Sequence, residues 1–237
     1  MLKKWISLCK LAILEPRLAR LAWQVKRSKT TFLSWPKLLS IVESFHLLHK
    51  HWPRKSLQVA EFGVGRGGSA ILLGWLIGRY GGTITLYDVF GQIPAPTEMD
   101  GERAQQRYEK ILHREGQEYY GNVPDLLEVV LREISRVCPR DRIETIQGRY
   151  EDVLPVQTAA KAFDLVHIDC DWYESSRVVL AYLKDHLSPG AILQIDDYGH
   201  WQGSRKAFNE AGWLDRYQSR PVDDALVVDM GHEKQPI

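Results

Sequence analysis

The stretch Val-Ala-Glu-Phe-Gly-Val-Gly-Arg-Gly-Gly-Ser-Ala, residues 59–70, sets the architecture that we expect for the whole chain. An apolar run precedes its glycines and a second apolar run, residues 71–77, follows them, which is the pattern of a strand, a tight turn and a helix. The glycines permit positive φ and a close approach of backbone to a ligand. The helix begins with free N–H groups and the positive end of its dipole. The stretch therefore predicts a seat for a nucleotide-like cofactor.

Three of these glycines, Gly63, Gly65 and Gly68, match the spacing Gly-x-Gly-x-x-Gly, which dinucleotide enzymes and methyltransferases share. Glu61, at the end of the preceding strand, separates the two classes. An acid there can hold a cationic or hydroxylated ligand, but it would repel the pyrophosphate of a dinucleotide. The alternative is a glycine-rich turn that binds nothing.

The composition is that of a soluble globular protein, with 44% hydrophobic and 26% charged residues among 237 and a net charge of +1. This length suffices for one α/β domain with a substantial core. The three cysteines, Cys9, Cys138 and Cys170, form no C-x-x-C pair, so we expect no disulfide or zinc site and a reducing, cytoplasmic location. No base-reading motif is visible, and we expect no nucleic-acid partner.

Residues 1–29 are strongly basic, with eight Lys and Arg residues against Glu15 alone. Lys10 interrupts the apolar run and no cleavage site follows, which argues against a signal peptide. We expect one basic amphipathic helix here, ahead of a single domain over residues 30–237. Its apolar stripe favours packing on its own domain or on a second subunit, in a homo-oligomer. The alternative is peripheral contact with an anionic membrane through residues 1–29.

Strands alternate with helices along the rest of the chain, which predicts an α/β fold with a doubly wound, mostly parallel sheet. A C-terminal antiparallel hairpin turns at Asp223-Asp224, and extra helices precede the first strand. The predicted strands span residues 57–62, 83–87, 143–147, 163–168, 191–195, 220–222 and 225–229. The predicted helices span residues 34–50, 69 onward, 102–115, 124–137, 175–187 and 205–211.

Acidic residues follow the predicted strands, at the edge of a parallel sheet where ligands bind. Asp88 ends the second strand beside the glycine turn and is placed to accept bonds from ribose hydroxyls. Two further clusters, Asp169-Cys170-Asp171 and Asp196-Asp197, would repel each other unless a cation lay among them. Oxygen ligands of this kind suit Mg²⁺. The alternative is that these acids cap the following helices and loops.

Five motifs together resemble the macrocin-type sugar O-methyltransferases, the family named for tylosin and mycinamicin tailoring enzymes. They are the glycine-rich stretch, the segment Asp-Val-Phe-Gly-Gln-Ile-Pro at 88–94, Gly-Arg-Tyr-Glu-Asp-Val-Leu-Pro at 148–155, His-Ile-Asp-Cys-Asp-Trp-Tyr-Glu-Ser at 167–175 and Ile-Asp-Asp-Tyr at 195–198. Their order and spacing agree from about residue 30 onward. Cys170, Trp172 and Val153 depart from the family's usual Gly, Leu and Thr, which puts the substrate in doubt more than the reaction.

The resemblance implies a Rossmann-like class I fold and an S-adenosylmethionine-dependent O-methyltransferase that requires a divalent cation such as Mg²⁺ and methylates a sugar or glycoside. Asp169, Asp196 and Asp197 would hold the metal, and Asp171 would be the base. Whether Asp169 or Asp171 is the base rather than a ligand stays open. The cofactor would contact Glu61, Gly63, Gly65, Arg66, Gly67, Gly68, Ser69, Asp88, Gly148, Tyr150 and Asp169.

Two other functions compete with this one. A nicotinamide-dependent sugar reductase or epimerase would need a Tyr-x-x-x-Lys pair, but Tyr173 is followed by Arg177 at that spacing. A non-catalytic, membrane-apposed binding protein would use only the basic N-terminal segment.

Overall fold

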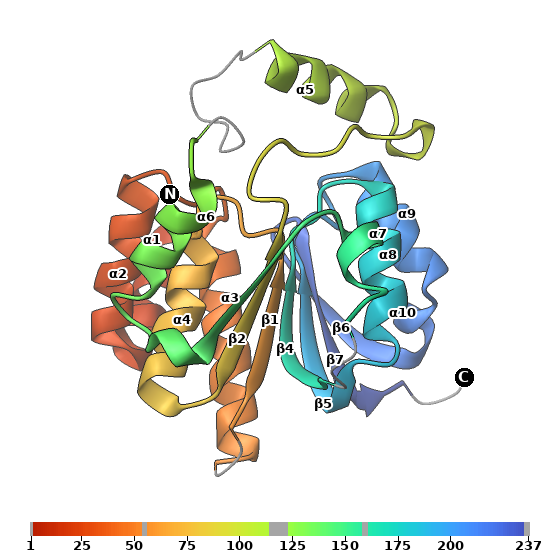
Figure 1. Ribbon diagram of the computed structural model, residues 1–237. Coiled ribbons are helices and arrows are strands. Elements are labelled where there is room, and N and C mark those ends of the chain that lie inside the picture. The colour runs from red at the N-terminus through yellow and green to blue at the C-terminus, as the bar shows by residue number, and fades with distance from the viewer. Residues whose placement is uncertain (1, 54–55, 114–122, 158–160, 235–237) are drawn as a thin grey trace.

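The computed structural model describes residues 2–53, 56–113, 123–157 and 161–234. Its core is a seven-stranded sheet in the order β3-β2-β1-β4-β5-β7-β6. The first five strands in that order run parallel, and β7 runs antiparallel to both β5 and β6 (Figure 1). The strands are β1 (Gln58–Phe62), β2 (Thr83–Asp88), β3 (Ile143–Gln147), β4 (Phe163–Ile168), β5 (Leu187–Ile195), β6 (Tyr217–Val222) and β7 (Ala225–Glu233). The predicted sheet and its C-terminal hairpin are confirmed.

Helices cover both faces of this sheet (Figure 1). Alternate strand residues enter different cores: Val59 and Leu165 face α1–α4 and α6, whereas Ala60 and Val166 face α7–α10. The helix α5 lies apart from both layers, above the carboxyl ends of the parallel strands. The helices are α1 (Leu2–Leu14), α2 (Pro16–Arg27), α3 (Trp35–His51), α4 (Gly68–Tyr80), α5 (Glu102–Leu112), α6 (Leu126–Ile134), α7 (Tyr150–Val153), α8 (Tyr173–Leu183), α9 (Gln202–Glu210) and α10 (Trp213–Arg216). The last two residues of the predicted 102–115 helix lie outside the described residues.

The N-terminal segment forms two helices rather than the single one expected. Pro16 cannot donate the backbone hydrogen bond that would continue α1, and its fixed φ suits the first turn of α2. Leu11 and Leu18 are fully buried in the same core as α3 and α4. No helix in the described ranges is long and apolar enough to cross a membrane.

The strand β5 begins four residues earlier than the sequence predicts. Ser188-Pro189-Gly190 was expected to end a helix and precede the strand, but the chain stays extended through it. The register with β4 shifts between Phe163 and Leu165, so the irregularity accommodates Pro189, which has no N–H for the ladder.

The glycine turn joins β1 to α4, and neighbouring segments of the chain pack closely against its glycines. Gly63 has φ +87°, and a Cβ there would overlap the backbone carbonyl of Asp169 at the end of β4. A Cβ on Gly68 would likewise collide with Thr30 and Thr31. The Gly68 N–H donates to the Thr30 carbonyl at 3.1 Å. Only glycine therefore allows the ends of β1 and β4 and the segment before α3 to meet.

Gly63→Ala is expected to lower the free energy of unfolding by about 3 kcal/mol, because the new methyl group collides with backbone that cannot move aside. Gly212→Ala is the control. Gly212 is in the left-handed conformation with φ +73° but has nothing within 4 Å of its Cβ position, so its loss is expected to be about 1 kcal/mol. Urea unfolding of both variants measures the difference, and equal losses would contradict the close approach.

Candidate functional site

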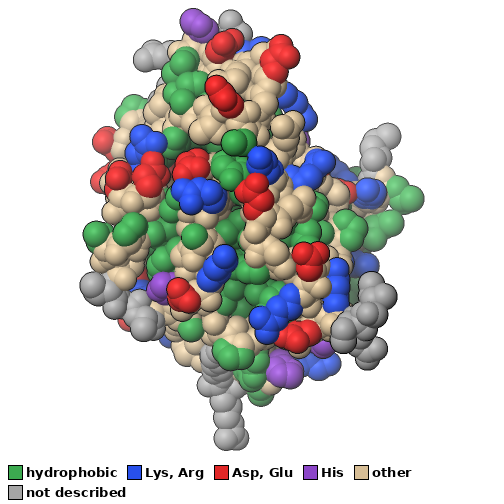
Figure 2. All heavy atoms as spheres, turned by 90° about the vertical axis from the view of Figure 1, so that its right-hand side faces the viewer, with side chains coloured by type: hydrophobic (Ala, Val, Ile, Leu, Met, Phe, Trp, Pro, Cys, Tyr) green, Lys and Arg blue, Asp and Glu red, His purple; other side chains and the backbone are tan. Residues whose placement is uncertain are grey.

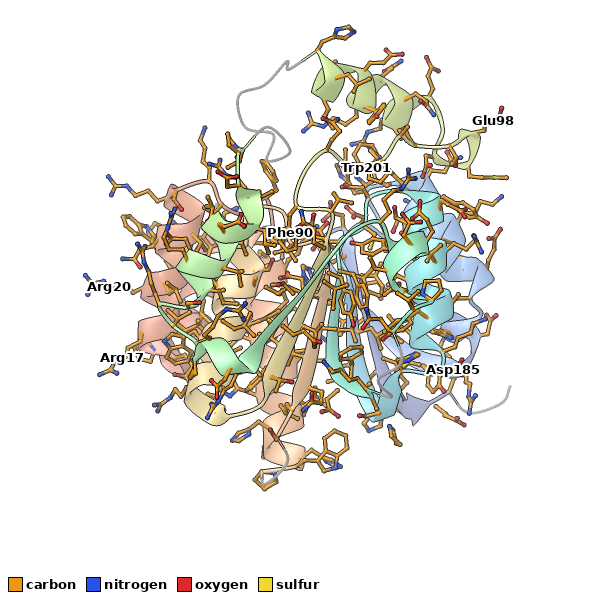
Figure 3. All side chains as sticks on the ribbon, in the orientation of Figure 1. Arg17, Arg20, Phe90, Glu98, Asp185 and Trp201 are labelled. Carbon is orange, nitrogen blue, oxygen red and sulfur yellow. The ribbon has the colours of Figure 1, made fainter. Side chains whose placement is uncertain are left out.

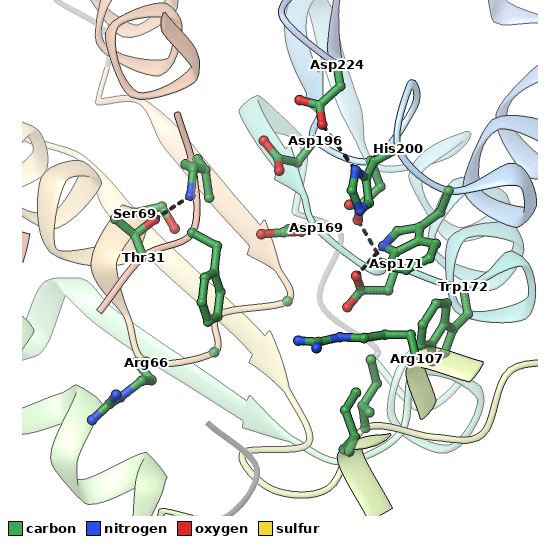
Figure 4. Close-up of a pocket in the computed structure, with 18 of the residues that line it drawn as sticks. Thr31, Arg66, Ser69, Arg107, Asp169, Asp171, Trp172, Asp196, His200 and Asp224 are labelled. Carbon is green, nitrogen blue, oxygen red and sulfur yellow. Dashed lines mark hydrogen bonds and ion pairs between the residues drawn. The ribbon is translucent and has the colours of Figure 1, made fainter. Parts of the chain in front are cut away.

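A cavity of about 550 Å³ opens at the carboxyl ends of the parallel strands. Its wall comes from the segment before α3, the glycine turn, α5 and the residues that follow β4 and β5 (Figure 4). A smaller cavity lies behind it, toward the ends of β2 and β3. The two share Gly63, Ile93, Asp169 and Asp171. Two ligands, one in each cavity, would therefore come into contact beside these residues.

Three carboxylates gather at this junction. Asp169, Asp171 and Asp197 each offer an oxygen, and these oxygens all lie within 4.8 Å of one another. Asp171 has φ +57°, an uncommon conformation for a residue other than glycine, and its N–H donates to Asp197 Oδ2 at 2.9 Å. Trp201 Nε1 donates to Asp171 Oδ1 at 2.8 Å.

Burial and mutual repulsion make these carboxyl groups resist ionisation together. Burial, with the neighbouring carboxylates, raises the pKa of Asp169 and Asp197 well above the usual range. Burial raises the pKa of Asp171 to about 6, although the bond from Trp201 opposes the rise. A divalent cation would relieve this repulsion, and carboxylate oxygens are the donors that Mg²⁺ prefers. The residues present therefore fit such an ion.

Asp196, predicted as a metal ligand, lies outside this cluster of three. Lys37 Nζ donates to its Oδ2 at 2.8 Å, and His167 Nε2 lies 3.9 Å from its Oδ1. Burial alone would raise its pKa, but His167 and Lys37 outweigh burial and lower it. Two of the three predicted ligands, Asp169 and Asp197, thus lie in the cluster with Asp171, whereas Asp196 pairs with Lys37 through Oδ2 and its Oδ1 has no hydrogen-bond partner among the described residues. Metal binding by Asp169, Asp196 and Asp197 stays a prediction.

Lys37 is a site residue that sequence reasoning missed. Its side chain is buried, and its ammonium group also lies 2.6 Å from Asp224 Oδ1 and 3.1 Å from the Asp196 carbonyl oxygen. The signal was its position on α3, where it shares a face with the buried Ile41 and Leu48. A lysine at helical spacing within an apolar stripe indicates a buried partner.

Glu61 is buried within the sheet and does not line either cavity, where a cofactor contact was predicted. It is fully buried, and its Oε1 lies 2.8 Å from His167 Nδ1. Burial alone would lower the pKa of His167, but the neighbouring carboxylates of Asp196 and Glu61 raise it to about 9. Among the described residues that line the two cavities, Glu61 is not present. Glu61 thus pairs with His167, the residue beside it in the register of β1 and β4. Its contact with a cofactor stays a prediction.

The predicted glycine turn divides between two tasks. Gly63, Gly65, Arg66 and Ser69 line the larger cavity. Gly67 and Gly68 instead allow close packing, against Val130 and against Thr30 and Thr31, respectively. They shape the turn without lining the cavity, so the structure does not place these two predicted contacts at its wall.

Asp88 holds the glycine turn in place. Its Oδ2 accepts from the N–H groups of Val64 at 2.6 Å and Gly65 at 2.9 Å, and its Oδ1 accepts from Phe90 at 2.7 Å. It also lines the smaller cavity together with Tyr150. A carboxylate has about four lone-pair sites, so these three bonds leave it an acceptor position. Ribose binding by Asp88 stays a prediction.

Gly148 does not line either cavity and instead contacts the backbone of Asp88. Its N–H donates to the Asp88 carbonyl at 3.0 Å, which ties the end of β3 to the end of β2. Tyr150, two residues later, packs edge-on against Phe62 with ring centres 6.0 Å apart.

Two further residues missed by the sequence anchor the loop between β2 and α5. Trp172 Nε1 donates to the Pro94 carbonyl at 2.9 Å, and its ring packs against Trp201. Asp100 is buried and accepts from the N–H groups of Tyr173 and Thr97. The loop is thereby fixed over the cavity, with α5 above it.

Cys170, where the family pattern has glycine, is buried beside the end of β1. Its buried Sγ lies 3.7 Å from the Phe62 carbonyl oxygen, and the left-handed conformation falls on Asp171. The residues needed by the competing reductase are engaged elsewhere: the Tyr173 hydroxyl donates to Glu210, and Arg177 pairs with Glu174.

Comparison with known proteins relates the chain to O-methyltransferases. The family model described as macrocin O-methyltransferase (TylF) matches residues 56–213. A Streptomyces olivaceus protein, 8-demethyl-8-(2,3-dimethoxy-alpha-L-rhamnosyl)-tetracenomycin-C 4'-O-methyltransferase, is 29% identical over 141 residues, which are 59% of this chain and 52% of that protein. The chain thus spans about half the length of this relative.

Solved methyltransferase structures share the fold. The O-methyltransferase NovP superposes with a TM-score of 0.68 at 23% identity, over 84% of this chain and 81% of NovP. The calicheamicin methyltransferase CalS11 gives a TM-score of 0.63 at 20% identity, over 82% of this chain and 78% of that one. The sheet and its flanking helices are therefore those of the class I methyltransferases.

Lys37→Met is expected to lower the free energy of unfolding by about 3 kcal/mol in the presence of a chelator, because it leaves the buried Asp196 carboxylate without its cation. Lys3→Met, which breaks the solvent-exposed ion pair with Asp223, is the control and is expected to cost less than about 1 kcal/mol. Adding Asp196→Asn to Lys37→Met is expected to recover part of the loss. Urea unfolding of the four proteins checks this, and a loss for Lys37→Met no larger than that of the control would refute the pairing.

Proposed function

We propose, because this chain belongs to the macrocin O-methyltransferase family, that it transfers a methyl group from S-adenosylmethionine to a hydroxyl of a sugar or glycoside. The observation that carries the proposal is the cluster of Asp169, Asp171 and Asp197 at the junction of two cavities, beside the glycine turn. The names of relatives support the acceptor class. One methylates a rhamnosyl group at its 4' oxygen, and CalS11 is described as a TDP-rhamnose 3'-O-methyltransferase.

The donor would span the two cavities. The turn residues Gly63 and Gly65, with Ser69, offer backbone and hydroxyl groups to the methionine end. Asp88 and Tyr150, which line the smaller cavity, offer a carboxylate and an aromatic ring to the adenosine end, although the cavity's volume of about 40 Å³ is too small to enclose it without widening. The sulfonium methyl would then lie near the shared residues, facing the larger cavity where an acceptor enters. TomG from Streptomyces achromogenes, a structural neighbour with a TM-score of 0.52, was solved in complex with this donor.

The acidic cluster would hold a divalent cation such as Mg²⁺. Asp169 and Asp197 would supply two of its oxygens, and Asp196, whose Oδ1 has no hydrogen-bond partner among the described residues, would supply a third. When bound, such an ion lowers the pKa of an acceptor hydroxyl and orients it. Two adjacent hydroxyls of a sugar suit this role.

Asp171 is the residue best placed to take the proton from the acceptor. It lines both cavities, and Trp201 holds its Oδ1 so that the second oxygen remains available. Burial raises its pKa, which makes it a stronger base than an ordinary aspartate, and a cation held by its neighbours would keep it ionised at neutral pH. The acceptor oxygen forms its bond to the methyl carbon as the carbon–sulfur bond breaks, and the proton goes to this carboxylate.

Methyl transfer to a panel of nucleotide sugars and glycosides, with labelled S-adenosylmethionine and with or without EDTA, tests the function. We expect transfer to at least one acceptor and a loss of about 100-fold or more with EDTA, restored by Mg²⁺. Transfer that survives complete removal of metal would exclude the ion. Binding of NADH without binding of S-adenosylmethionine would exclude methyl transfer itself.

Asp171→Asn is expected to slow turnover by about 1,000-fold, because the amide cannot accept the proton. Donor affinity, measured by calorimetry, is expected to stay nearly unchanged. Asp185→Asn, an exposed aspartate after α8, is the control and should leave both quantities unaltered. Near-normal turnover in Asp171→Asn would remove its assignment as base.

A further inference from the structure

The first helix exposes a stripe of large apolar side chains. Leu2, Trp5 and Ile13 are 75%, 58% and 82% exposed, and Ile6 and Leu14 are also exposed. The opposite face carries the buried Ser7 and Leu11, which pack on the domain. Of the large hydrophobic residues found exposed among the described residues, more than half lie in α1 and α2. An apolar stripe this prominent indicates an interaction surface.

Positive charge surrounds this stripe. Residues 1–29 carry a net charge of +7, and their one acid, Glu15, is buried and accepts a hydrogen bond from the Tyr80 hydroxyl. Arg17 and Arg20 project from α2 into solvent on the outer side of the molecule (Figure 3). Lys4 lies over the Trp5 ring and Arg27 over the Trp23 ring.

The opposite side of the molecule has a different character. Figure 2 shows that Lys and Arg side chains there are interspersed with Asp and Glu. The net charge of the whole chain is only +1, so residues 30–237 are acidic overall. The excess of positive charge is therefore a property of α1 and α2 and of the short segment that follows them.

We propose that α1 and α2 form a docking face for an anionic lipid bilayer. A second copy of the chain fits this face poorly, because a twofold interface would place one +7 segment against another. An anionic bilayer satisfies both features at once: its headgroups attract the Lys and Arg side chains, and its interface accepts Trp5 and the neighbouring aliphatic side chains. With 13 residues, α1 is suited to lie in the plane of the interface.

The docking face adjoins the mouth of the larger cavity. Lys3 Nζ lies 3.0 Å from Asp223 Oδ1, and Ser34 Oγ donates to Asp223 Oδ2 at 2.6 Å. The next residue, Asp224, lines the cavity. The start of α1 therefore lies close to the part of the β6–β7 turn that lines the cavity. This inference rests on surface geometry and does not depend on the proposed reaction.

Sedimentation of the full chain with vesicles tests the proposal. Vesicles of phosphatidylcholine with 30% phosphatidylglycerol are compared with pure phosphatidylcholine, at low and high salt. We expect binding to the anionic vesicles that weakens as salt rises, and little binding to the neutral ones.

Two pairs of variants separate the apolar and charged contributions. Trp5→Ser with Ile13→Ser is expected to weaken partitioning by about tenfold or more. Lys4→Gln with Lys10→Gln is expected to weaken it by about fivefold for each charge removed. Val156→Ser, at an exposed apolar residue after α7, and Lys50→Gln with Lys184→Gln are the matched controls and should bind as the unmodified chain does.

Equal binding to both vesicle types, or variants of α1 that bind no worse than the controls, would overturn the proposal. Sedimentation velocity provides the other decisive result. A dimer that Trp5→Ser with Ile13→Ser converts to a monomer, without vesicle binding by either form, would assign this face to a second copy of the chain.

Discussion

Repulsion among carboxylates at one edge of the sheet is the constraint that the rest of the site satisfies. Parallel strands end at the same edge of the sheet, so Asp88, Asp169 and Asp196, which end or follow β2, β4 and β5, lie at that edge together. Each is stabilised differently. Asp88 accepts three backbone N–H groups, and Asp196 has Lys37 and His167. Asp169 is buried among carboxylates that raise its pKa, and the more distant charge of Lys37 does not outweigh them. That last deficit is where a cation fits.

The same edge also shows how the chain covers a site that its sheet leaves open. Trp172 and Asp100 fasten the loop after β2 to the start of α8, and this positions α5 above the cavity. Arg103 on α5 donates to the His200 carbonyl and lies over the Trp201 ring, which itself holds Asp171. The helix α5 above the cavity and the candidate base Asp171 are therefore connected through Trp201.

The elements that the sequence predicted well are those with local causes. β3 and β4 match the predicted residues, because β-branched and apolar runs bounded by turn residues specify strands directly. One error arose where a distant contact prevails and the other where a single residue does. Ser188-Pro189-Gly190 reads as a turn in isolation but stays extended beside β4, and the first 29 residues form two helices because one proline outweighs a continuous amphipathic pattern.

The sequence alone established the order of strands and helices, the glycine turn and the gathering of acids at the strand ends, because parallel strands separated by helices leave few topologies open. It also carried the family resemblance. Only the tertiary structure assigned the acids their partners: Asp171 joined the cluster and Asp196 turned to Lys37, which lies 159 positions away in the chain. Partnership depends on side-chain direction and on which distant element packs nearby. Spacing along the chain encodes neither the direction of a side chain nor its distant neighbour. Glu61, for this reason, contacts His167 and does not line the cavity.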